Sequence, residues 1–460
     1  MSRLIVVSNR VAMPRDRSAR AGGLVVGILS ALKRSSGIWF GWSGETAEAP
    51  AAPRLVKSGG ISYVTMEFTP EDFEHYYNGY CNSTLWPLLH FRLGLVENSR
   101  LTQDAYMRIN GQFADHVAAM AQPDDIIWVH DYQLMALPGE LRLRGLKNRI
   151  GFFLHIPLPG PEILCALPAH RQLMGSLAEC DLVGFQTHSD LRAFRDYAVY
   201  EAGGKAYDDG TVEMMGRRLR AGVFPIGIDV EEMESLAKQA EDDEDTRRLV
   251  ESIAGRQLII GVDRLDYSKG ILGRINAVGE LLSSRPDYRN KITFVQIAAP
   301  SRIDVSRYRR LRREIEETAG RINGRHAEID WVPVRYLNRV YPRRQLAGFY
   351  RVARLGLVTP LRDGMNLVAK EYVAAQRAED PGVLVLSRFA GAAKDMTGAL
   401  VVNPFDIVEI AEAIDRGLRM PLGERQERWE SLMKELRRHD LAHWSQGFLD
   451  SLTVHRAAAA

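Results

Sequence analysis

The stretch Leu258-Ile259-Ile260-Gly261-Val262 runs directly into Asp263-Arg264-Leu265-Asp266-Tyr267-Ser268-Lys269-Gly270, and it indicates the fold of the chain. The first part is apolar and rich in β-branched side chains, which predicts a buried strand. A polar loop follows, and amphipathic sequence of helical period begins near Gly270. A strand, a loop and a helix in this order form the repeating unit of a parallel α/β sheet.

Similar short apolar runs recur on both sides of this stretch and alternate with segments of helical period. The chain of 460 residues also exceeds what one hydrophobic core usually serves. We therefore predict an α/β protein with two doubly wound, Rossmann-like domains. The other predicted strands are Leu4 to Val7, Ile126 to Val129, Ile150 to Leu154, Leu182 to Phe185, Ile292 to Ile297, Ile329 to Val334, Leu355 to Val358 and Val383 to Leu386.

The change from apolar to polar sequence after Phe224 to Ile228 predicts the junction between the domains. The first domain then spans residues 1–230, the second spans 231–440, and residues 441–460 form a helix that returns to the first domain. The acidic run Glu241 to Asp245 predicts a solvated face. Ligand loops of doubly wound domains lie at the carboxyl ends of strands, so two facing domains would enclose a site.

The charge balance and the cysteine content exclude several classes of protein. Lys and Arg number 60 against 58 Asp and Glu, so no overall field favours nucleic acid or anionic lipid. The three cysteines lack the spacing of metal ligands and suit a reducing compartment. No apolar run has the length of a signal sequence or a membrane span. These features predict a cytoplasmic protein that uses no metal, cofactor, nucleic acid or membrane.

Two cations lie in the loop after the strand Leu258 to Val262. Arg264 and Lys269 could neutralise the charge that develops on a departing nucleoside diphosphate. Ion pairing at the surface is the alternative explanation for the same two residues. In the first half, Gly22-Gly23 opens a helical stretch, and a helix start of this kind can bind phosphate. An ordinary tight turn is the alternative there.

A second candidate ligand loop follows the strand Leu355 to Val358. Gly364 permits an unusual turn, and the residues after it begin a helix whose first N–H groups could meet a ligand. Asp363 could accept hydrogen bonds from sugar hydroxyls, and Glu371 lies about two helical turns further on. A carboxylate that only caps the helix is the alternative explanation for Asp363.

Polar residues also follow strands of the first half. Asp131 comes after the strand Ile126 to Val129, and His155 comes after the next strand, so both belong to one edge of the sheet. A lone histidine at such a position is usually structural. In the second half, Arg302 follows the strand Ile292 to Ile297 and could hold a sugar phosphate with two hydrogen bonds. Pairing with a helix dipole is the alternative for Arg302.

Aromatic residues of the segment around Tyr76-Tyr77 and Trp86 have two explanations. Aromatic side chains in a sequence of mixed pattern usually belong to the core. Stacking against a sugar is the alternative. Several enzyme classes lack support altogether, because the chain has no zinc-ligand spacing, nucleophile elbow, P-loop or dinucleotide fingerprint. It also has no Asp-x-Asp stretch at a strand end, so Arg and Lys would have to neutralise a diphosphate without Mg²⁺.

Four motifs give the chain a close resemblance to glycosyltransferase family 20 over nearly its full length. They are Leu361 to Tyr372, Arg264 to Gly270, Trp39 to Gly44 and Asn78 to Pro87. The resemblance implies the two-Rossmann fold called GT-B. It also implies a retaining transfer of glucose from a nucleotide-glucose to glucose 6-phosphate, which gives α,α-trehalose 6-phosphate. UDP-glucose is favoured as donor by the resemblance alone.

The resemblance also assigns roles to individual residues. Those implied for the donor are Gly23, Arg264, Lys269, Asp363, Gly364, Met365, Asn366, Leu367 and Glu371. Those implied for the acceptor are Arg10, Tyr77, Trp86, Asp131 and Arg302. Those implied in catalysis are His155, Arg264, Lys269 and Asp363. The family's reaction resembles a front-face displacement, in which the leaving phosphate oxygen takes the proton of the acceptor hydroxyl.

Two rival functions follow from the same residues. One is a sister transferase with another acceptor, such as glycerol 3-phosphate, and the other is a nucleotide-sugar-binding regulator without turnover. Gln133 stands where family members commonly have His, which leaves the acceptor preference open. The oligomeric state is open as well, a homo-oligomer included.

Overall fold

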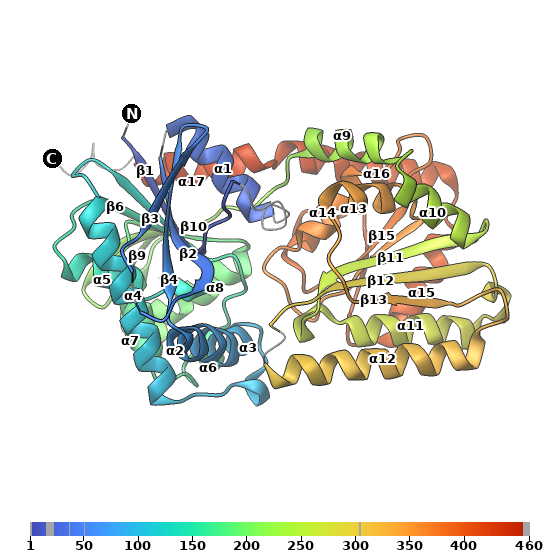
Figure 1. Ribbon diagram of the computed structural model, residues 1–460, viewed down its shortest axis with the longest axis horizontal. Helices are drawn as coiled ribbons and strands as arrows, with labels where there is room; N and C mark the ends of the chain where they lie inside the picture. The colour runs from blue at the N-terminus through green and yellow to red at the C-terminus, as the bar shows by residue number, and fades with distance from the viewer. Residues whose placement is uncertain (1, 15–22, 36, 50, 303–304, 454–460) are drawn as a thin grey trace. The chain divides into compact units, whose positions relative to one another are not determined.

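The computed structural model describes residues 2–14, 23–35, 37–49, 51–302 and 305–453 (Figure 1). The chain divides into two units, which are described separately below. Unit 1 comprises residues 1–226 together with 442–460, and unit 2 comprises residues 227–441. The sequence predicted these junctions after residues 230 and 440.

The sheet of unit 2 has six strands in the order β13-β12-β11-β14-β15-β16, and every neighbouring pair is parallel. The strands are β11 (Gln257–Arg264), β12 (Ile292–Ala299), β13 (Val334–Leu337), β14 (Leu355–Val358), β15 (Val383–Ser387) and β16 (Leu400–Val402). The winding reverses between β11 and β14, and doubly wound sheets bind ligands at the carboxyl ends of the strands at such a switch point. The loops after β11 and β14 are therefore where this unit places its candidate ligand residues.

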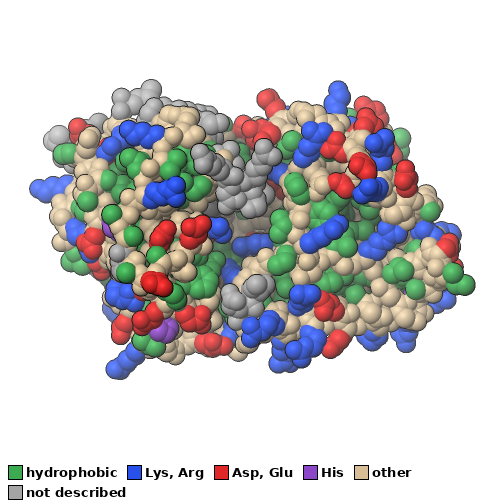
Figure 2. Space-filling view, in the orientation of Figure 1, with side chains coloured by type: hydrophobic (Ala, Val, Ile, Leu, Met, Phe, Trp, Pro, Cys, Tyr) green, Lys and Arg blue, Asp and Glu red, His purple; other side chains and the backbone are tan. Residues whose placement is uncertain are grey.

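Helices cover both faces of this sheet. They are α9 (Val230–Ala240), α10 (Glu244–Ile253), α11 (Ile271–Ser284), α12 (Ser306–His326), α13 (Arg343–Val352), α14 (Leu367–Ala374), α15 (Ile407–Arg419) and α16 (Leu422–Arg438), with the short turns η6 (Tyr267–Lys269), η7 (Pro286–Tyr288) and η8 (Gly391–Lys394). α11 packs against α12 and α15 on one face, and α13 packs against α9 and α14 on the other (Figure 1). Figure 2 shows Lys and Arg side chains along the edge formed by α12, whose Arg310 pairs with Glu314 one turn away.

One strand prediction for unit 2 was wrong, and the prediction for the acidic run was incomplete. The strand expected at Ile329 begins only at Val334, because Pro333 has no N–H for a sheet ladder and Ile329 lies exposed in a turn. The acidic run after α9 is not simply solvated. Arg344 of α13 donates to both carboxylate oxygens of Asp243 at 2.7 Å, and Arg351 donates to Glu241 at 2.5 Å.

The sheet of unit 1 has ten strands in the order β3-β4-β2-β1-β5-β6-β7-β10-β9-β8. They are β1 (Leu4–Arg10), β2 (Ile38–Thr46), β3 (Arg54–Ser58), β4 (Ile61–Phe68), β5 (Ile126–His130), β6 (Arg149–Phe153), β7 (Leu182–Phe185), β8 (Lys205–Ala206), β9 (Thr211–Met214) and β10 (Arg217–Val223). Neighbours from β4 through β10 are parallel, whereas β3, β9 and β8 add antiparallel edges. The winding reverses between β1 and β5, which is the switch point of this sheet.

The helices of unit 1 include a long π-helical segment. They are α1 (Gly23–Ser35), α2 (Pro70–Asp72), η2 (Phe73–Leu85), α3 (Trp86–Leu89), η3 (Leu93–Leu95), α4 (Arg100–Met120), η4 (Tyr132–Leu134), α5 (Leu137–Leu143), α6 (Pro161–Leu164), α7 (His170–Ala178), α8 (His188–Asp196), η5 (Tyr197–Glu201) and α17 (Leu441–Thr453). The π-helix is η2, and it carries the aromatic segment singled out in the sequence.

α17 packs behind the carboxyl ends of β5 and β6. The rings of Trp444 and Phe448 lie 5.2 and 4.9 Å from that of Trp128. Gly151 and Gly184 make room for this helix, since a Cβ at either position would lie 2.7 Å from a ring carbon of Phe448. Within the described residues, no helix combines the length and the apolar character needed to cross a bilayer.

Candidate functional site

Lys269 and Asp363 meet at the switch point of the unit 2 sheet. Lys269 Nζ donates to Asp363 Oδ2 at 2.5 Å, and the two side chains are only 10% and 13% exposed. Each residue comes from one of the two predicted ligand loops, after β11 and β14. The pair is thus more shielded from water than an exposed surface pair, so its attraction is stronger.

Asn366 begins α14 and holds the second of these loops. It has a left-handed backbone with φ 76°, its Oδ1 accepts from Ala369 N at 3.3 Å, and its Nδ2 donates to Asp363 Oδ2 at 3.0 Å. Two expectations are corrected here. The helix is capped by Asn366 rather than by Asp363, and the unusual backbone lies at Asn366 rather than at Gly364. The carbonyl of Gly364 instead lies against Gly391, where a Cβ would be 1.8 Å away.

The remaining residues of this loop line the start of α14. Met365 is buried, and Leu367 is the first residue of the helix. Glu371 follows in the second turn, with its Oε1 3.7 Å from Arg343 Nε. Burial raises the pKa of Glu371 to about 7, although Arg343 acts in the opposite direction. A carboxyl group that titrates near neutrality is therefore held one turn inside the helix.

Arg264 ends β11, and Arg302 lies in the segment that follows the neighbouring strand β12. Arg264 is the exposed last residue of β11. Arg302 follows β12 with a left-handed φ of 49°, and its Nη1 donates to Asp266 Oδ2 at 2.9 Å and to Tyr308 Oη at 2.6 Å. The expected alternative of a helix dipole is thus replaced by an ion pair with the loop that carries Lys269.

Asp131 and His155 meet at the carboxyl edge of the unit 1 sheet. Asp131 has φ 76°, its N–H donates to Phe153 O at 2.8 Å, and its Oδ1 accepts from the N–H of His155 at 3.2 Å. The predicted convergence of these two strand ends is therefore present in the structure. Arg10 ends β1 on the other side of the switch point.

Both ring nitrogens of His155 are engaged within unit 1. Gln186 Oε1 accepts from Ile226 N at 3.0 Å, so its Nε2 faces His155 Nδ1 at 3.5 Å. His155 Nδ1 therefore accepts from Gln186 Nε2, and His155 Nε2–H donates to His130 Nδ1 at 3.0 Å. Burial lowers the pKa of His155 to about 3. The imidazole is therefore neutral at physiological pH, and it offers neither a positive charge nor a spare ring proton.

The guanidinium group of Arg10 lies against Gly44, the last residue of the motif Trp39 to Gly44. A Cβ at Gly44, whose φ is +95°, would lie 2.6 Å from Arg10 Nε. Only glycine fits this backbone and leaves the guanidinium in place. The motif Trp39 to Gly44 thus provides the surface against which Arg10 is positioned.

The aromatic candidates differ in exposure. Tyr77 is half-buried in η2, and its ring lies 5.5 Å from those of Trp42 and Phe73. Trp86 is buried, with its ring 4.0 Å from that of His90. As placed, Trp86 belongs to the core, and the acceptor role of both residues stays a prediction.

Gly23 is the first described residue of α1, and Gly22 lies outside the described residues. The phosphate role of this helix start also stays a prediction.

Three residues that position the site were not assigned any role from the sequence. They are Gly44, Gln186 and Asp266. Gln186 directly follows β7, so the reasoning that found Asp131 and His155 after β5 and β6 would have found it too. Asp266 accepts from Ser268 N at 2.9 Å and caps η6. An aspartate whose side chain accepts from the backbone N–H two residues later is a common turn pattern, and this pattern could have identified it.

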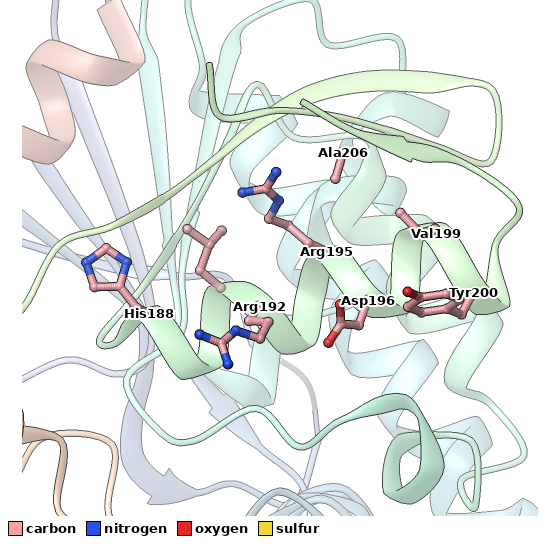
Figure 3. Close-up of a pocket in the computed structure, with 8 residues that line it drawn as sticks. His188, Arg192, Arg195, Asp196, Val199, Tyr200 and Ala206 are labelled. Carbon is pink, nitrogen blue, oxygen red and sulfur yellow. The ribbon is translucent and has the colours of Figure 1, made fainter. Parts of the chain in front are cut away.

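A pocket elsewhere in unit 1 includes none of the predicted residues. Figure 3 shows it against α8 and η5. Its cavity volume is about 380 Å³. Its lining residues are His188, Leu191, Arg192, Arg195, Asp196, Val199, Tyr200 and Ala206. Arg195 donates to the carbonyl of Tyr207, and Tyr200 is exposed.

Two doubly wound, Rossmann-like sheets in one chain form the GT-B architecture of glycosyltransferases that the sequence predicted, and the comparisons with known proteins show the family. The family model of glycosyltransferase family 20 matches residues 2–454. The chain belongs to this family.

Its relatives match along the full length. A trehalose-6-phosphate synthase of Sinorhizobium fredii is 49% identical over 99% of both chains. The crystal structure of a UDP-forming α,α-trehalose-phosphate synthase from Burkholderia vietnamiensis has a TM-score of 0.98 and 47% identity, covering 100% of this chain and 99% of that one. A Burkholderia xenovorans enzyme in complex with glucose-6-phosphate has a TM-score of 0.95 and 47% identity, covering 98% of this chain and 100% of that one.

Proposed function

We propose that the protein transfers glucose from UDP-glucose to glucose 6-phosphate and releases α,α-trehalose 6-phosphate and UDP. The observation that carries this proposal is the shielded pair of Lys269 and Asp363 at the unit 2 switch point, with Asn366 bonded to the same carboxylate oxygen. A cation and a sugar-binding carboxylate side by side suit a glycosyl diphosphate. Support for the two substrates comes from the relatives, which include a UDP-forming α,α-trehalose-phosphate synthase and an enzyme in complex with glucose-6-phosphate.

The donor is assigned to the residues of unit 2, with two additions from unit 1. Arg264 and Lys269 neutralise the diphosphate, helped by Gly23 and by the backbone of residues 364–367 at the start of α14. Glu371 accepts hydrogen bonds from the ribose. Asp363 and the main chain of His155 hold the donor glucose, because the ring of His155 is already engaged.

The acceptor is assigned to residues that end strands or lie near them. Arg10, Tyr77 and Arg302 are placed nearest its phosphate, where guanidinium groups can form charge-assisted hydrogen bonds. Asp131 and Trp86 are assigned to its sugar ring. For Arg302 this role requires the phosphate to meet a guanidinium that Asp266 already orients.

The chemistry requires no nucleophile from the protein. The anomeric hydroxyl of glucose 6-phosphate attacks C1 of the donor glucose on the face from which the diphosphate leaves. The bond between C1 and the diphosphate oxygen breaks, and that oxygen takes the proton of the attacking hydroxyl. Arg264 and Lys269 stabilise the charge that develops on the leaving group. The configuration at C1 is retained.

The test is a matrix of donors and acceptors with purified protein. UDP-, GDP- and ADP-glucose are each incubated with glucose 6-phosphate and with glycerol 3-phosphate, and products are identified by mass. We expect a disaccharide monophosphate from UDP-glucose and glucose 6-phosphate. A glucosylated glycerol phosphate would show that the protein is a sister transferase with a different acceptor. The absence of a product from every pair would contradict the proposal.

We also propose a cytoplasmic location. None of the three cysteines, all within the described residues, forms a disulfide, as is usual in a reducing compartment. Assembly into a homo-oligomer stays a prediction.

A further inference from the structure

Arg274 is a fully buried charge beneath the donor loops, and no motif in the sequence drew attention to it. It lies in the first turn of α11 and is 0% exposed. A guanidinium remains ionised even in a protein interior, so burying it is costly unless several groups accept its hydrogen bonds. The partners of Arg274 therefore indicate what this charge does.

Its partners come from four different segments of unit 2. Nη1 donates to Asp263 Oδ2 at 2.5 Å and to Gln296 Oε1 at 2.9 Å, which joins the end of β11 to the middle of β12. Nε donates to Thr359 Oγ1 at 3.2 Å, at the start of the loop after β14. Nη2 donates to the carbonyl of Lys269 at 3.2 Å. One side chain thus contacts both loops of the switch point.

The two ligand loops also contact each other around this guanidinium. Leu361 N donates to Ser268 O at 2.7 Å, and a Cβ at Gly270 would lie 2.2 Å from Thr359 O. The backbone of Lys269 is therefore held by Arg274, while its ammonium group is held by Asp363 at the other end of the side chain. A shift of either loop would separate the pair.

We propose that Arg274 is a positioning residue for the donor site: it touches no substrate, and it fixes the loop of Lys269 against the loop of Asp363. The inference rests on the proposed function, because it takes those two residues to hold the donor. The guanidinium group has five N–H donors in a fixed planar arrangement, which explains why arginine occupies position 274. A lysine ammonium group is a single compact charge and could not reach four partners in different directions.

The chain offers a matched control in Arg425. This arginine of α16 is also buried in unit 2, at 6% exposure, and its Nη1 donates at 2.5 Å to Asp380 Oδ1 and to the carbonyl of Pro381. Asp380 and Pro381 precede β15, and Nε donates to the carbonyl of Met420 at 3.3 Å, at the end of α15. None of these partners lies in a donor loop. Removing Arg425 should therefore disturb packing without moving the donor loops.

The experiment measures UDP binding by isothermal titration calorimetry and thermal stability by scanning calorimetry, in wild type, Arg274→Lys, Arg274→Met and Arg425→Met. We expect both Arg274 variants to weaken UDP binding roughly tenfold. They should lower kcat/KM for the donor by about 10- to 100-fold, which is the loss expected when binding groups shift by about 1 Å. Arg425→Met should lower the melting temperature comparably and leave the UDP Kd within twofold.

A milder variant and a double mutant keep the test decisive if Arg274→Met fails to fold. Thr359→Val removes one bond of Arg274 and should weaken UDP binding severalfold, and the effect of Arg274→Lys should shrink in a Lys269→Ala background. UDP affinities of Arg274→Lys and Thr359→Val within twofold of wild type would overturn the inference. Wild-type protein that binds no UDP would instead defeat the proposed function.

Discussion

Strand-end loops hold the candidate residues in both sheets, but the two sheets stabilise these loops in different ways. In unit 2, ion pairs dominate: Lys269 with Asp363, Arg302 with Asp266 and Arg274 with Asp263. In unit 1, the corresponding edge is held by neutral contacts, with His155 between His130 and Gln186 and the ring of Trp444 5.8 Å away.

This difference matches the charges of the groups that each sheet is proposed to hold. A diphosphate brings negative charge that only cations can neutralise, and buried acids keep those cations in place until it binds. The edge around His155 is proposed to hold a sugar ring, which needs hydrogen bonds and shape, and neutral groups provide these without the cost of burying charge. The acceptor phosphate is assigned instead to Arg10, Tyr77 and Arg302. Substitutions in unit 2 should therefore act through charge, and those in unit 1 through geometry. The predictions below test this distinction.

The largest effect is expected from Arg264→Ala. Loss of a cation that stabilises the leaving diphosphate should lower kcat/KM by about 100- to 1,000-fold, by analogy with lost oxyanion donors. Steady-state assays of disaccharide phosphate formation measure it. The exposed Arg310→Ala on α12 is the control and should have wild-type activity. Activity of Arg264→Ala within threefold of wild type would remove this residue from the mechanism.

A geometric effect of the next size is expected from Gly44→Ala. The added Cβ would overlap Arg10 Nε, so the guanidinium must move, and kcat/KM for the acceptor should fall by about 10- to 100-fold. Gly60→Ala is the matched control, because Gly60 has φ +80° but no atom within 4 Å of an added Cβ. It should show similar backbone strain and normal acceptor kinetics. Equal kinetics for both variants would mean that Gly44 does not position Arg10.

The neutral histidines of unit 1 should make stability depend on pH. The pKa of His155 falls from 6.5 in an unfolded chain to about 3. Burial, and to a smaller extent the neighbouring His155, lowers the pKa of His130 well below its usual range. The unfolded state therefore binds more protons, and the unfolding free energy should fall below pH 6.5 by up to about 1.4 kcal/mol per pH unit for each histidine.

Urea titrations at several pH values between about 7.5 and about 5, a range that brackets the usual pKa of histidine, measure this slope. His155→Gln should have a shallower slope than wild type, since one titrating group is gone. Identical slopes in the two proteins would show that His155 protonates normally in the folded chain.

The smallest effect concerns the donor and Glu371. Its pKa of about 7 means that the carboxyl group is largely protonated at pH 6 and ionised at pH 8, the form that accepts best from ribose hydroxyls. UDP-glucose should therefore bind about fivefold more tightly at pH 8 than at pH 6, with release of a proton near neutrality. Calorimetry in buffers of different ionisation enthalpy detects that proton. Glu371→Gln should bind with little dependence on pH, and an unchanged dependence would exclude Glu371 as its source.

The sequence predicted the sheet of unit 2 better than that of unit 1. Most strands of unit 2 are short buried apolar runs. The run at Ile329 misled because Pro333 interrupts it, and β16, which has only three residues, was not predicted. In unit 1, β2 reads Ile-Trp-Phe-Gly-Trp-Ser-Gly-Glu-Thr and β3 is polar, so neither shows the apolar run by which strands were recognised. These strands form only when neighbouring strands complete the sheet.

For the site, the sequence located residues by their place after strands, and this reasoning found Lys269, Asp363, Asp131 and His155. It could not show that Lys269 pairs with Asp363, because 94 residues separate them and the contact depends on the switch point. Arg274 was missed for the same reason, since its four partners converge only in the folded sheet. Long-range pairing of this kind carries no local pattern.

The proton NMR spectrum of the product tests the central claim most directly. Purified protein is incubated with UDP-glucose and glucose 6-phosphate, and the anomeric signals of the phosphorylated product are recorded. We predict two anomeric protons, both with the small coupling of an α linkage, as α,α-trehalose 6-phosphate requires. A β-linked disaccharide would contradict retention, and no disaccharide phosphate at all would contradict the proposed reaction.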